Sequence, residues 1–407
     1  MKDSGVEWIG KIPESWDLKR LKFILKERKL KNDPIITKEI LSLSVERGVF
    51  PYSEKTGGGN KAKEDLTAYK VAYPGDIVVN SMNILAGAVG LSNYKGAVSP
   101  VYYTLYTDSD KINIEYYYYL FQTEAFQKSL LGLGNGILMK ESSTGKLNTI
   151  RMRIPMEKLS SLLMPIPTIE VQKKIVSHVA EKVESVNKII AETRQSIEEL
   201  KKYKQSLITE TITKGLDKNV DVKDSEIRWI GKYPIKWGLN QLKTIIKVKN
   251  GKEINHEGGN IPVYGSGGIF KYTDEILYSK PSILFGRKGT IGKPILVEGD
   301  FWTVDTMFYT EVNTNRSIYK WVYYLLSSLP WAYYTTQTAI PSIVGSEVES
   351  IFIPYPSKEE QGKIVEFLDE KIGEIDVLIS EKQRITQELE RYKNSIIYEY
   401  VTGKKEV

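Results

Sequence analysis

Two segments of the chain carry hydrophobic residues at alternating steps of three and four, the spacing of a coiled-coil seam. The first seam runs through Val176, Val179, Val183, Val186, Ile190, Ile197 and Leu200. The second runs through Val365, Leu368, Ile372, Ile375, Ile379 and Leu389. Both pass a polar middle and then resume, so we expect a shift of register there. The pattern predicts two long helices, over residues 168–215 and 357–407.

Both predicted helices have clear start and stop signals. Each follows a Pro-x-Pro sequence, at 165–167 and 354–356, which cannot lie inside a helix. Ser357-Lys-Glu-Glu360 is a capping box, whereas Thr168 begins an incomplete one. Glycines stand where a helix end favours a left-handed residue, at Gly215 and Gly403.

With a rise of 1.5 Å per residue, each predicted helix is roughly 60 Å long. Neither helix can bury its hydrophobic seam alone. We therefore expect the two helices to pair with each other. Antiparallel pairing would place two globular domains at opposite ends, related by a pseudo-two-fold axis. The alternative, that each helix packs onto its own domain as ordinary core, stays open.

An internal duplication organises the rest of the chain. Residues 2–24 and 223–245 share 13 identities in 23 positions, including the motif Trp8-Ile-Gly-Lys-Ile-Pro-x-x-Trp16 and its copy. The helical blocks 165–213 and 354–402 share 19 identities in 49 positions. The chain therefore repeats one plan: opening motif, globular insert, Pro-x-Pro and long helix.

The two globular inserts align only weakly. Faint landmarks are Gly87-Ala-Val-Gly90 beside Gly289-Thr-Ile-Gly292, and Tyr118-Tyr-Leu120 beside Tyr323-Tyr-Leu325. Common ends with divergent middles indicate one scaffold that presents two different surfaces. We predict an α+β protein with globular α/β domains at 1–167 and 216–356, separated by the two helices.

Composition and charge narrow the class of protein. The chain has 407 residues, 41% of them hydrophobic, so it is long enough for two domains. It has no cysteine and two histidines, and no stretch approaches a membrane span, so we expect a soluble cytoplasmic protein without a metal site. The segments 169–214 and 359–401 carry net charges of +2 and −5. Because the whole chain carries +6, the residues outside these two segments carry a net charge of +9. A basic globular part on neutral or acidic helices suits a partner with phosphates.

Motifs for catalysis are missing from the sequence. Gly286-Arg-Lys-Gly289-Thr-Ile-Gly292-Lys293 resembles a phosphate loop, but its spacing is one residue too long and Pro294 replaces the required Ser or Thr. We find no dinucleotide fingerprint, no methyltransferase tetrapeptide and no Asp…Glu-x-Lys nuclease set. The sequence therefore predicts a protein that is not an enzyme.

Glycine-rich polar loops with cations occur in both inserts and suit nucleic acid. Glycines let backbone amides approach phosphates, while Lys, Arg, Asn, Ser and Thr can reach phosphates or base edges. In one such loop, Arg287 could read guanine while Lys288 and Thr290 hold phosphate. The predicted DNA-binding residues are Lys55, Asn60, Lys61, Lys63, Ser81, Asn83, Lys140, Ser142, Ser143, Thr144, Lys146, Tyr264, Ser266, Lys271, Arg287, Lys288, Thr290 and Lys293.

With the duplicated opening motif and the two Pro-x-Pro-x-x-x-x-Gln-x-x-Ile helix starts, the chain resembles the specificity subunits of type I restriction-modification enzymes. The resemblance covers essentially the full length. Many members have Glu-Gln at the helix start; Glu360-Gln361 fits, whereas Val171-Gln172 departs from the pattern.

The resemblance implies two target recognition domains that each read half of an asymmetric bipartite site in double-stranded DNA. It also implies helices that act as spacer and as docking surface for two methyltransferase subunits, with restriction subunits joining the complex in phage defence. S-adenosylmethionine, ATP and Mg²⁺ would then belong to those partners, and no cofactor to this chain. Two rivals stay open: a two-headed coiled-coil scaffold that binds proteins, and an enzyme with an unfamiliar motif.

Overall fold

The protein divides into two compact units. The computed structural model describes residues 1–56, 62–137, 151–336 and 341–407. Unit 1 comprises Met1–Glu192 and Ile385–Val407, and unit 2 comprises Thr193–Arg384. The two long helices are α4 (Ile169–Lys214) and α7 (Lys358–Val401), and the boundary between the units passes through both of them.

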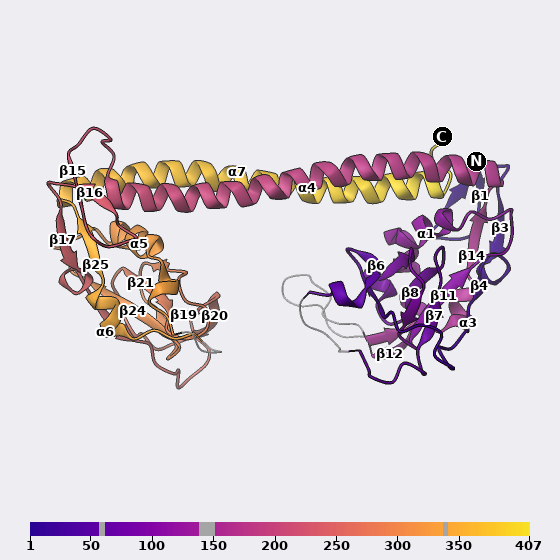
Figure 1. Ribbon diagram of the computed structural model, residues 1–407, viewed down its shortest axis with the longest axis horizontal. Coiled ribbons are helices and arrows are strands. Elements are labelled where there is room, and N and C mark those ends of the chain that lie inside the picture. Colours follow the sequence, from indigo (N-terminus) through magenta and orange to yellow (C-terminus); the bar gives the residue numbers. More distant parts are fainter. Residues whose placement is uncertain (57–61, 138–150, 337–340) are drawn as a thin grey trace. The chain divides into compact units, whose positions relative to one another are not determined.

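Helices α4 and α7 pack side by side and run antiparallel (Figure 1). In unit 1, His178 Nε2 lies 3.0 Å from the hydroxyl of Tyr400. In unit 2, Lys204 Nζ lies 2.7 Å from the carboxylate of Asp376. From the first contact to the second, the residue number rises in α4 and falls in α7, so the two helices run antiparallel. The predicted helix pair is confirmed.

The buried seam follows the predicted three-four spacing, and its first turns also serve the domains. Val179 and Leu368 are fully buried. Each belongs to the core of the domain that its own helix follows. Both packing modes weighed from the sequence are therefore present: a helix start packs on its own domain, and the helices pack on each other.

Both helices end on a glycine in the left-handed conformation, as predicted. The φ angles of Gly215 and Gly403 are +75° and +69°. A β-carbon at Gly215 would lie 2.9 Å from the ring of Trp237, and one at Gly403 would lie 2.9 Å from the ring of Trp16. Because the space is taken, each duplicated tryptophan fixes the end of one long helix against an opening motif.

The globular part of unit 1 is built on a four-stranded antiparallel sheet with helix α1 (Ile114–Gln122) packed on β9. Its strands lie in the order β4 (Lys26–Glu27), β11 (Tyr102–Tyr106), β8 (Ile77–Asn80) and β9 (Val89–Leu91). Tyr116 and Tyr117 of α1 are fully buried and form part of the core of this domain.

Unit 2 contains the same sheet. Its strands lie in the order β18 (Ile246–Asn250), β24 (Met307–Val312), β21 (Ser282–Gly286) and β22 (Ile295–Val297). Helix α5 (Tyr319–Ser328) packs on β21 and β22 and buries Trp321 completely. In both units the strand order is first, fourth, second and third along the chain, so inserts with little sequence similarity share one topology.

Smaller sheets are also matched between the units. The opening motifs form β1/β2 (Lys2–Asp3, Lys11–Ile12) and β15/β16 (Val222–Asp224, Lys232–Pro234). The two ends of each insert are joined by β3/β14 (Asp17–Arg20, Leu163–Ile166) and β17/β25 (Gly238–Gln241, Phe352–Tyr355). These pairings bring the start of each insert beside its end, close to the helix that follows.

Each insert adds a hairpin between the first two strands of its sheet. The hairpins are β5/β6 (Leu41–Ser44, Gly48–Pro51) and β19/β20 (Ile261–Gly265, Gly268–Thr273). In both units the first hairpin strand, or the residue just before it, also pairs in parallel with a later segment of the insert. In unit 1 Ile40 pairs with Ala97, and in unit 2 β19 pairs with β23 (Trp302–Thr303). The hairpins are therefore topologically equivalent.

The remaining strands and α-helices of the described residues are short. They are β7 (Lys70–Ala72), β10 (Gly96–Val98), α2 (Glu124–Ser129), β12 (Asn135–Ile137), β13 (Arg151–Arg153), α3 (Met156–Ser160) and α6 (Gly345–Ser350). Among the described residues, no helix combines the length and the hydrophobicity that crossing a membrane requires.

Candidate nucleic-acid interface

The loop after β21 holds the predicted residues Arg287, Lys288 and Thr290. A β-carbon at Gly286 would lie 2.0 Å from the carbonyl oxygen of Thr290, so this tight turn requires glycine. The backbone N–H of Arg287 donates to Thr306 at 2.8 Å, which fixes the start of the loop. Lys288 and Thr290 are exposed and Arg287 is half-buried. The loop is therefore held by its backbone and leaves its polar side chains at the surface.

The cations of this loop are available for a partner. The Arg287 guanidinium lies 5.8 Å from the centre of the Phe308 ring. Within the described ranges, no carboxylate pairs with Arg287, Lys288 or the exposed Lys293. Because a phosphate or a guanine edge would meet no competing internal carboxylate, the loop suits a nucleic acid.

The other predicted residues of unit 2 lie on the hairpin β19/β20. Tyr264 is partly buried against Phe301, and burial raises the pKa of its phenol. Ser266 is exposed at the turn. Lys271 is exposed and paired with Glu257, so this cation is already partly neutralised.

The hairpin and the arginine loop flank one connection. Val304, between β23 and β24, donates its N–H to the carbonyl of Tyr264 at 3.3 Å. Two residues later, the carbonyl of Thr306 accepts from Arg287. The structure therefore brings the two predicted segments of unit 2 to the same edge of the domain.

The sequence did not reveal the hydrophobic character of that hairpin. Ile269, Phe270 and Tyr272 of β20 are 48%, 53% and 51% exposed. They stand beside the predicted polar residues and could contact base edges or the methyl group of thymine. A hairpin signal was present, because Ser266-Gly-Gly268 separates two strand-like runs, but such residues are usually read as core.

In unit 1 the equivalent loop follows β8 and carries different side chains. Tyr102 pairs with Asn80 at the end of β8, as Met307 pairs with Gly286 at the end of β21. The next residue is therefore Ser81 in unit 1 and Arg287 in unit 2. Met82 and Asn83 are exposed there.

Ser81 itself is not at the surface. Its side chain is fully buried and its hydroxyl donates to the carbonyl of Val101 at 2.7 Å. This bond joins β8 to the connection before β11. We therefore leave Ser81 out of the candidate interface and keep the neighbouring Asn83.

The remaining predictions for unit 1 fall near or within undescribed segments. Lys63 is exposed, and Lys55 Nζ lies 5.3 Å from the centre of the Tyr52 ring. Seven predicted residues lie outside the described residues: Asn60, Lys61, Lys140, Ser142, Ser143, Thr144 and Lys146.

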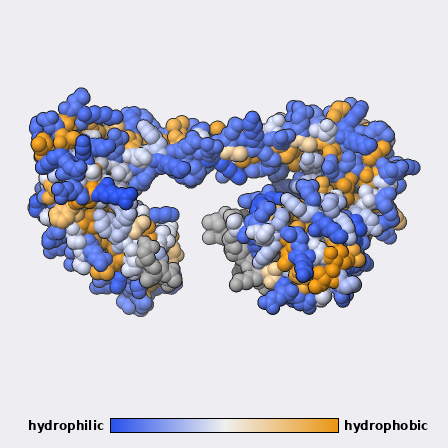
Figure 2. Space-filling view, viewed as in Figure 1, coloured by the Kyte–Doolittle hydropathy of each residue, from blue (hydrophilic) through white to orange (hydrophobic). Residues whose placement is uncertain are grey.

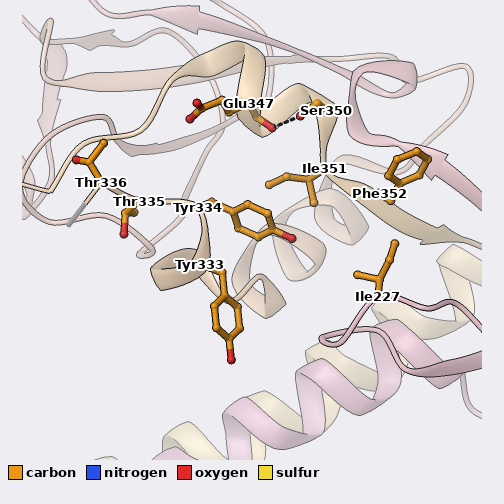
Figure 3. Close-up of a pocket in the computed structure, with 9 residues that line it drawn as sticks. All are labelled: Ile227, Tyr333, Tyr334, Thr335, Thr336, Glu347, Ser350, Ile351 and Phe352. Atoms are coloured by element: carbon orange, nitrogen blue, oxygen red, sulfur yellow. Dashed lines mark hydrogen bonds between the residues drawn. The ribbon is translucent and has the colours of Figure 1, made fainter.

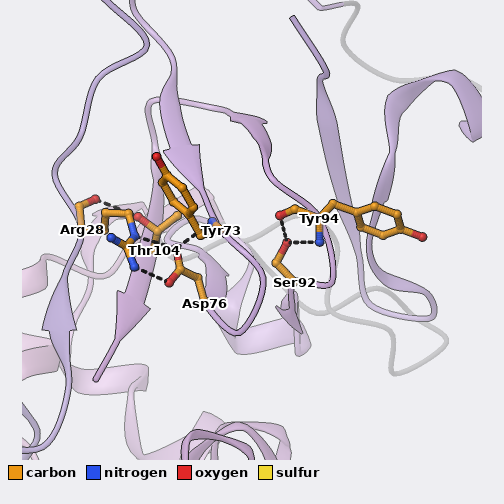
Figure 4. Close-up of polar contacts among 6 residues, drawn as sticks. All are labelled: Arg28, Tyr73, Asp76, Ser92, Tyr94 and Thr104. Atoms are coloured by element: carbon orange, nitrogen blue, oxygen red, sulfur yellow. Dashed lines mark hydrogen bonds and ion pairs between the residues drawn. The ribbon is translucent and has the colours of Figure 1, made fainter. Parts of the chain in front are cut away.

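A buried carboxylate in unit 1 belongs to an internal ion pair (Figure 4). Asp76 directly precedes β8. It accepts from Arg28 Nε and Nη2 at 2.8 and 2.9 Å and from the N–H of Tyr73 at 2.9 Å. The hydrogen bonds that the Arg28 guanidinium donates to the Asp76 carboxylate raise the pKa of Arg28. With its oxygens occupied, Asp76 stabilises the sheet and offers nothing to a metal or substrate.

A pocket of about 510 Å³ lies elsewhere in unit 2 (Figure 3). Tyr333, Tyr334, Ile351 and Phe352 are among its lining residues, and Glu347 is the one carboxylate among the described residues that line it. None of the described residues that line it is a lysine or an arginine, so this lining does not fit a phosphate. Across the described part of the chain, no three His, Cys, Asp or Glu residues gather closely enough to hold a metal ion.

Comparisons with known proteins agree with this architecture. Residues 234–391 match the family model of the type I restriction modification DNA specificity domain. The putative type I restriction enzyme MjaX specificity subunit of Methanocaldococcus jannaschii is 26% identical, over 97% of this chain and 95% of that protein. The MjaVIII specificity subunit of the same organism is 25% identical, over 97% and 94%.

A solved structure shares the fold. A chain from a study of complex assembly and conformational transition of the type I R-M system superposes with a TM-score of 0.70 at 15% identity, covering 97% of this chain and 100% of that one.

The fold and the sites define a two-domain protein with a shared helix pair and paired surface loops. By sequence and fold, the chain is similar to the specificity subunits of type I restriction-modification enzymes. The similarity is to a specificity subunit, which is a non-catalytic component of such systems.

Proposed function

We propose that the chain is the DNA-reading subunit of its restriction-modification complex and recognises an asymmetric, two-part target in double-stranded DNA. Residues 1–167 and 216–356 act as target recognition domains, and 168–215 and 357–407 as spacer helices. Two methyltransferase subunits and the restriction subunits dock on the chain in the cytoplasm. S-adenosylmethionine, ATP and Mg²⁺ are bound by those partners.

One observation carries the proposal: equivalent loops on equivalent sheets present different side chains. The loop after β8 exposes Met82 and Asn83, whereas the equivalent loop after β21 presents Arg287 and Lys288. A shared scaffold with different exposed residues is what two readers of different sequences require, because base edges are distinguished by the pattern of donors and acceptors they meet.

The test is a paired substitution in one domain. Arg287→Ala with Lys288→Ala is expected to weaken binding at one half-site by about 1–3 kcal/mol and to relax its sequence preference, because a bidentate base contact is lost. The measurement is DNA binding at fixed salt on probes in which each half-site is randomised in turn. Arg228→Ala with Lys236→Ala is the control, since it removes the same charges from exposed positions of the opening motif in unit 2. Equal loss at both half-sites would contradict the proposal.

A further inference from the structure

A tight turn connects β23 to β24 and carries an exposed carboxylate. The N–H of Met307 donates to the carbonyl of Val304 at 2.9 Å, which closes a β-turn over residues 304–307. Asp305 and Thr306 are the two corner residues of this turn, and both are exposed. Hydrophilic residues are abundant on the visible surface of unit 2 (Figure 2), so exposure alone gives Asp305 no special role. What sets Asp305 apart is its position.

The turn lies between the two segments of unit 2 that form the candidate interface. On one side, the carbonyl of Thr306 accepts from the N–H of Arg287 at 2.8 Å, in the loop after β21. On the other side, the N–H of Val304 donates to the carbonyl of Tyr264 at 3.3 Å, in the hairpin β19/β20. Asp305 therefore stands between the cations of the loop and the exposed hydrophobic residues of the hairpin.

The end of β18 holds the backbone of the turn from a third side. The N–H of Gly251 donates to the carbonyl of Met307 at 3.0 Å. The N–H of Lys252 donates to the carbonyl of Thr303 at 2.9 Å, and the hydroxyl of Thr303 donates to the hairpin at Tyr264, also at 2.9 Å. Because these bonds fix the backbone on every side, the corner of the turn is presented at a defined position, as contact with a single base requires.

Asp305 has no structural task in this turn. Its carboxylate makes no hydrogen bond or ion pair with any other residue of the described ranges. In unit 1 the equivalent turn is closed by the N–H of Tyr102 and the carbonyl of Ser99 at 2.9 Å, and Pro100 occupies the same corner. Proline is favoured at that corner, so the fold does not need a carboxylate there. The difference concerns the surface that each unit presents.

A carboxylate at a DNA-binding edge is unfavourable unless it meets a hydrogen-bond donor, because it repels the phosphates. In the major groove, guanine presents two acceptors, thymine presents an acceptor and a methyl group, and adenine presents an acceptor beside its amino group. Cytosine is the base that presents an amino donor and no acceptor. A fixed carboxylate beside Arg287 therefore fits a cytosine that lies close to the guanine read by this arginine.

We propose that Asp305 is a specificity-determining residue, which accepts a hydrogen bond from the N4 amino group of a cytosine in the half-site of unit 2. The inference rests on the proposed function, which brings this edge of unit 2 against the base edges. Asp305 rejects the other three bases at its own position, because their acceptor atoms meet a negative charge. Pro100 gives unit 1 no such selection at the equivalent position.

The experiment measures DNA binding by the full chain on probes in which each base pair of the unit 2 half-site is varied in turn. Asp305→Asn keeps the size of the side chain and removes its charge. At one position the unaltered chain should prefer cytosine about tenfold or more, and the variant should prefer it by no more than about twofold. Affinity for DNA that lacks the target should rise a few-fold, because a charge that repels phosphates is gone.

Asp221→Asn is the matched control. It removes the same charge from an exposed position just before the opening motif of unit 2, and it should change neither the base preference nor the affinity.

A modified base tests the hydrogen bond itself. N4-methylcytosine still pairs with guanine, but its methyl group replaces the amino hydrogen that faces the major groove. At the cytosine whose preference depends on Asp305, this base should weaken binding of the unaltered chain about tenfold. It should leave the binding of Asp305→Ala within about twofold, because that variant has neither an acceptor to lose nor a side chain to clash with the methyl group.

The other outcomes would overturn the inference. An equal gain in affinity for every base would show that Asp305 only repels phosphates, and unchanged binding would show that it does not face the DNA. A structural role would lower the melting temperature of both variants, and the effects of the variant and the modified base would then be additive. Failure of the proposed function would look different, because the unaltered chain would then show no base preference in either half-site.

Discussion

At the start of each long helix, a buried glutamine joins the helix to the domain before it. Gln361 accepts from the N–H of Ile318 at 3.0 Å and donates to the carbonyl of Pro356 at 3.2 Å. Gln172 accepts from the N–H of Asn113 at 2.7 Å and donates to Pro167 at 2.8 Å. The duplicated glutamine of the sequence motif thus satisfies backbone groups that would otherwise be buried without partners.

Replacing this glutamine should destabilise one unit. Gln361→Leu leaves the N–H of Ile318 and the carbonyl of Pro356 buried and unpaired, so unit 2 is expected to lose about 2 kcal/mol or more of its free energy of unfolding. Hydrogen exchange on residues of unit 2 measures the change. The matched control Gln383→Leu lies on the exposed surface of α7 and should stay within about 0.5 kcal/mol of the unaltered chain. Equal effects of the two substitutions would mean that the hydrogen bonds contribute nothing.

Local signals explain which single residues the sequence could predict. Gly215 and Gly403 were predictable because a helix end requires a left-handed residue there. The capping box formed only in part: the N–H of Glu360 donates to Ser357 Oγ at 3.2 Å, but the Glu360 carboxylate accepts from Trp237 Nε1 at 2.8 Å. Trp237 is distant from Glu360 in the sequence, so this competing hydrogen bond could not be predicted from the local sequence pattern.

Among the elements, the long helices were predictable and the hairpins were not. Helix α4 spans Ile169–Lys214, inside the predicted range 168–215, because a long seam with marked ends has a strong period. The hairpin β19/β20 was read only as a polar cationic loop. Its exposed hydrophobic side chains depend on which face of the hairpin the domain core covers, and that is a tertiary property.

This hairpin should contribute to the half-site of its own domain. Phe270→Ser with Tyr272→Ser is expected to weaken binding of that half-site by about 1 kcal/mol or more, because apolar contacts with the DNA are lost. Stability should hardly change, since both rings are about half exposed. Fluorescence anisotropy with the two half-sites varied separately measures the effect, and Tyr333→Ser, which is 65% exposed, serves as the control. An unchanged affinity would exclude the hairpin from the interface.

At the scale of the whole molecule, the internal repeat is interleaved and not simply sequential. Unit 1 combines the first insert and the start of α4 with the end of α7, whereas unit 2 combines the second insert and the start of α7 with the end of α4. Lys404, just after α7, donates to the carbonyl of Ile9 at 2.6 Å, so the last turn of the chain completes the first domain. Each unit therefore needs residues from both halves of the sequence.

Helices α4 and α7 each continue from one unit into the other, so their length offers a test of the two-part target. A seven-residue insertion into both helices, at the polar middle near Thr193 and Thr386, keeps the heptad spacing of the seam. It adds about 10 Å of helix, close to the rise of about three base pairs. We expect the tolerated spacer between the half-sites to change while both half-site sequences stay the same, because no reading side chain is altered.

Mapping of methylated motifs in cells that contain the altered chain and its methyltransferase measures both quantities at once. The insertion into α4 alone is the control: it lengthens one strand of the pair, takes the seam residues beyond it out of register with α7, and should lower the melting temperature of the chain. New half-site sequences after the double insertion would mean that the helices take part in reading bases. An unchanged spacer would mean that the helix pair does not set the distance between the two recognition events.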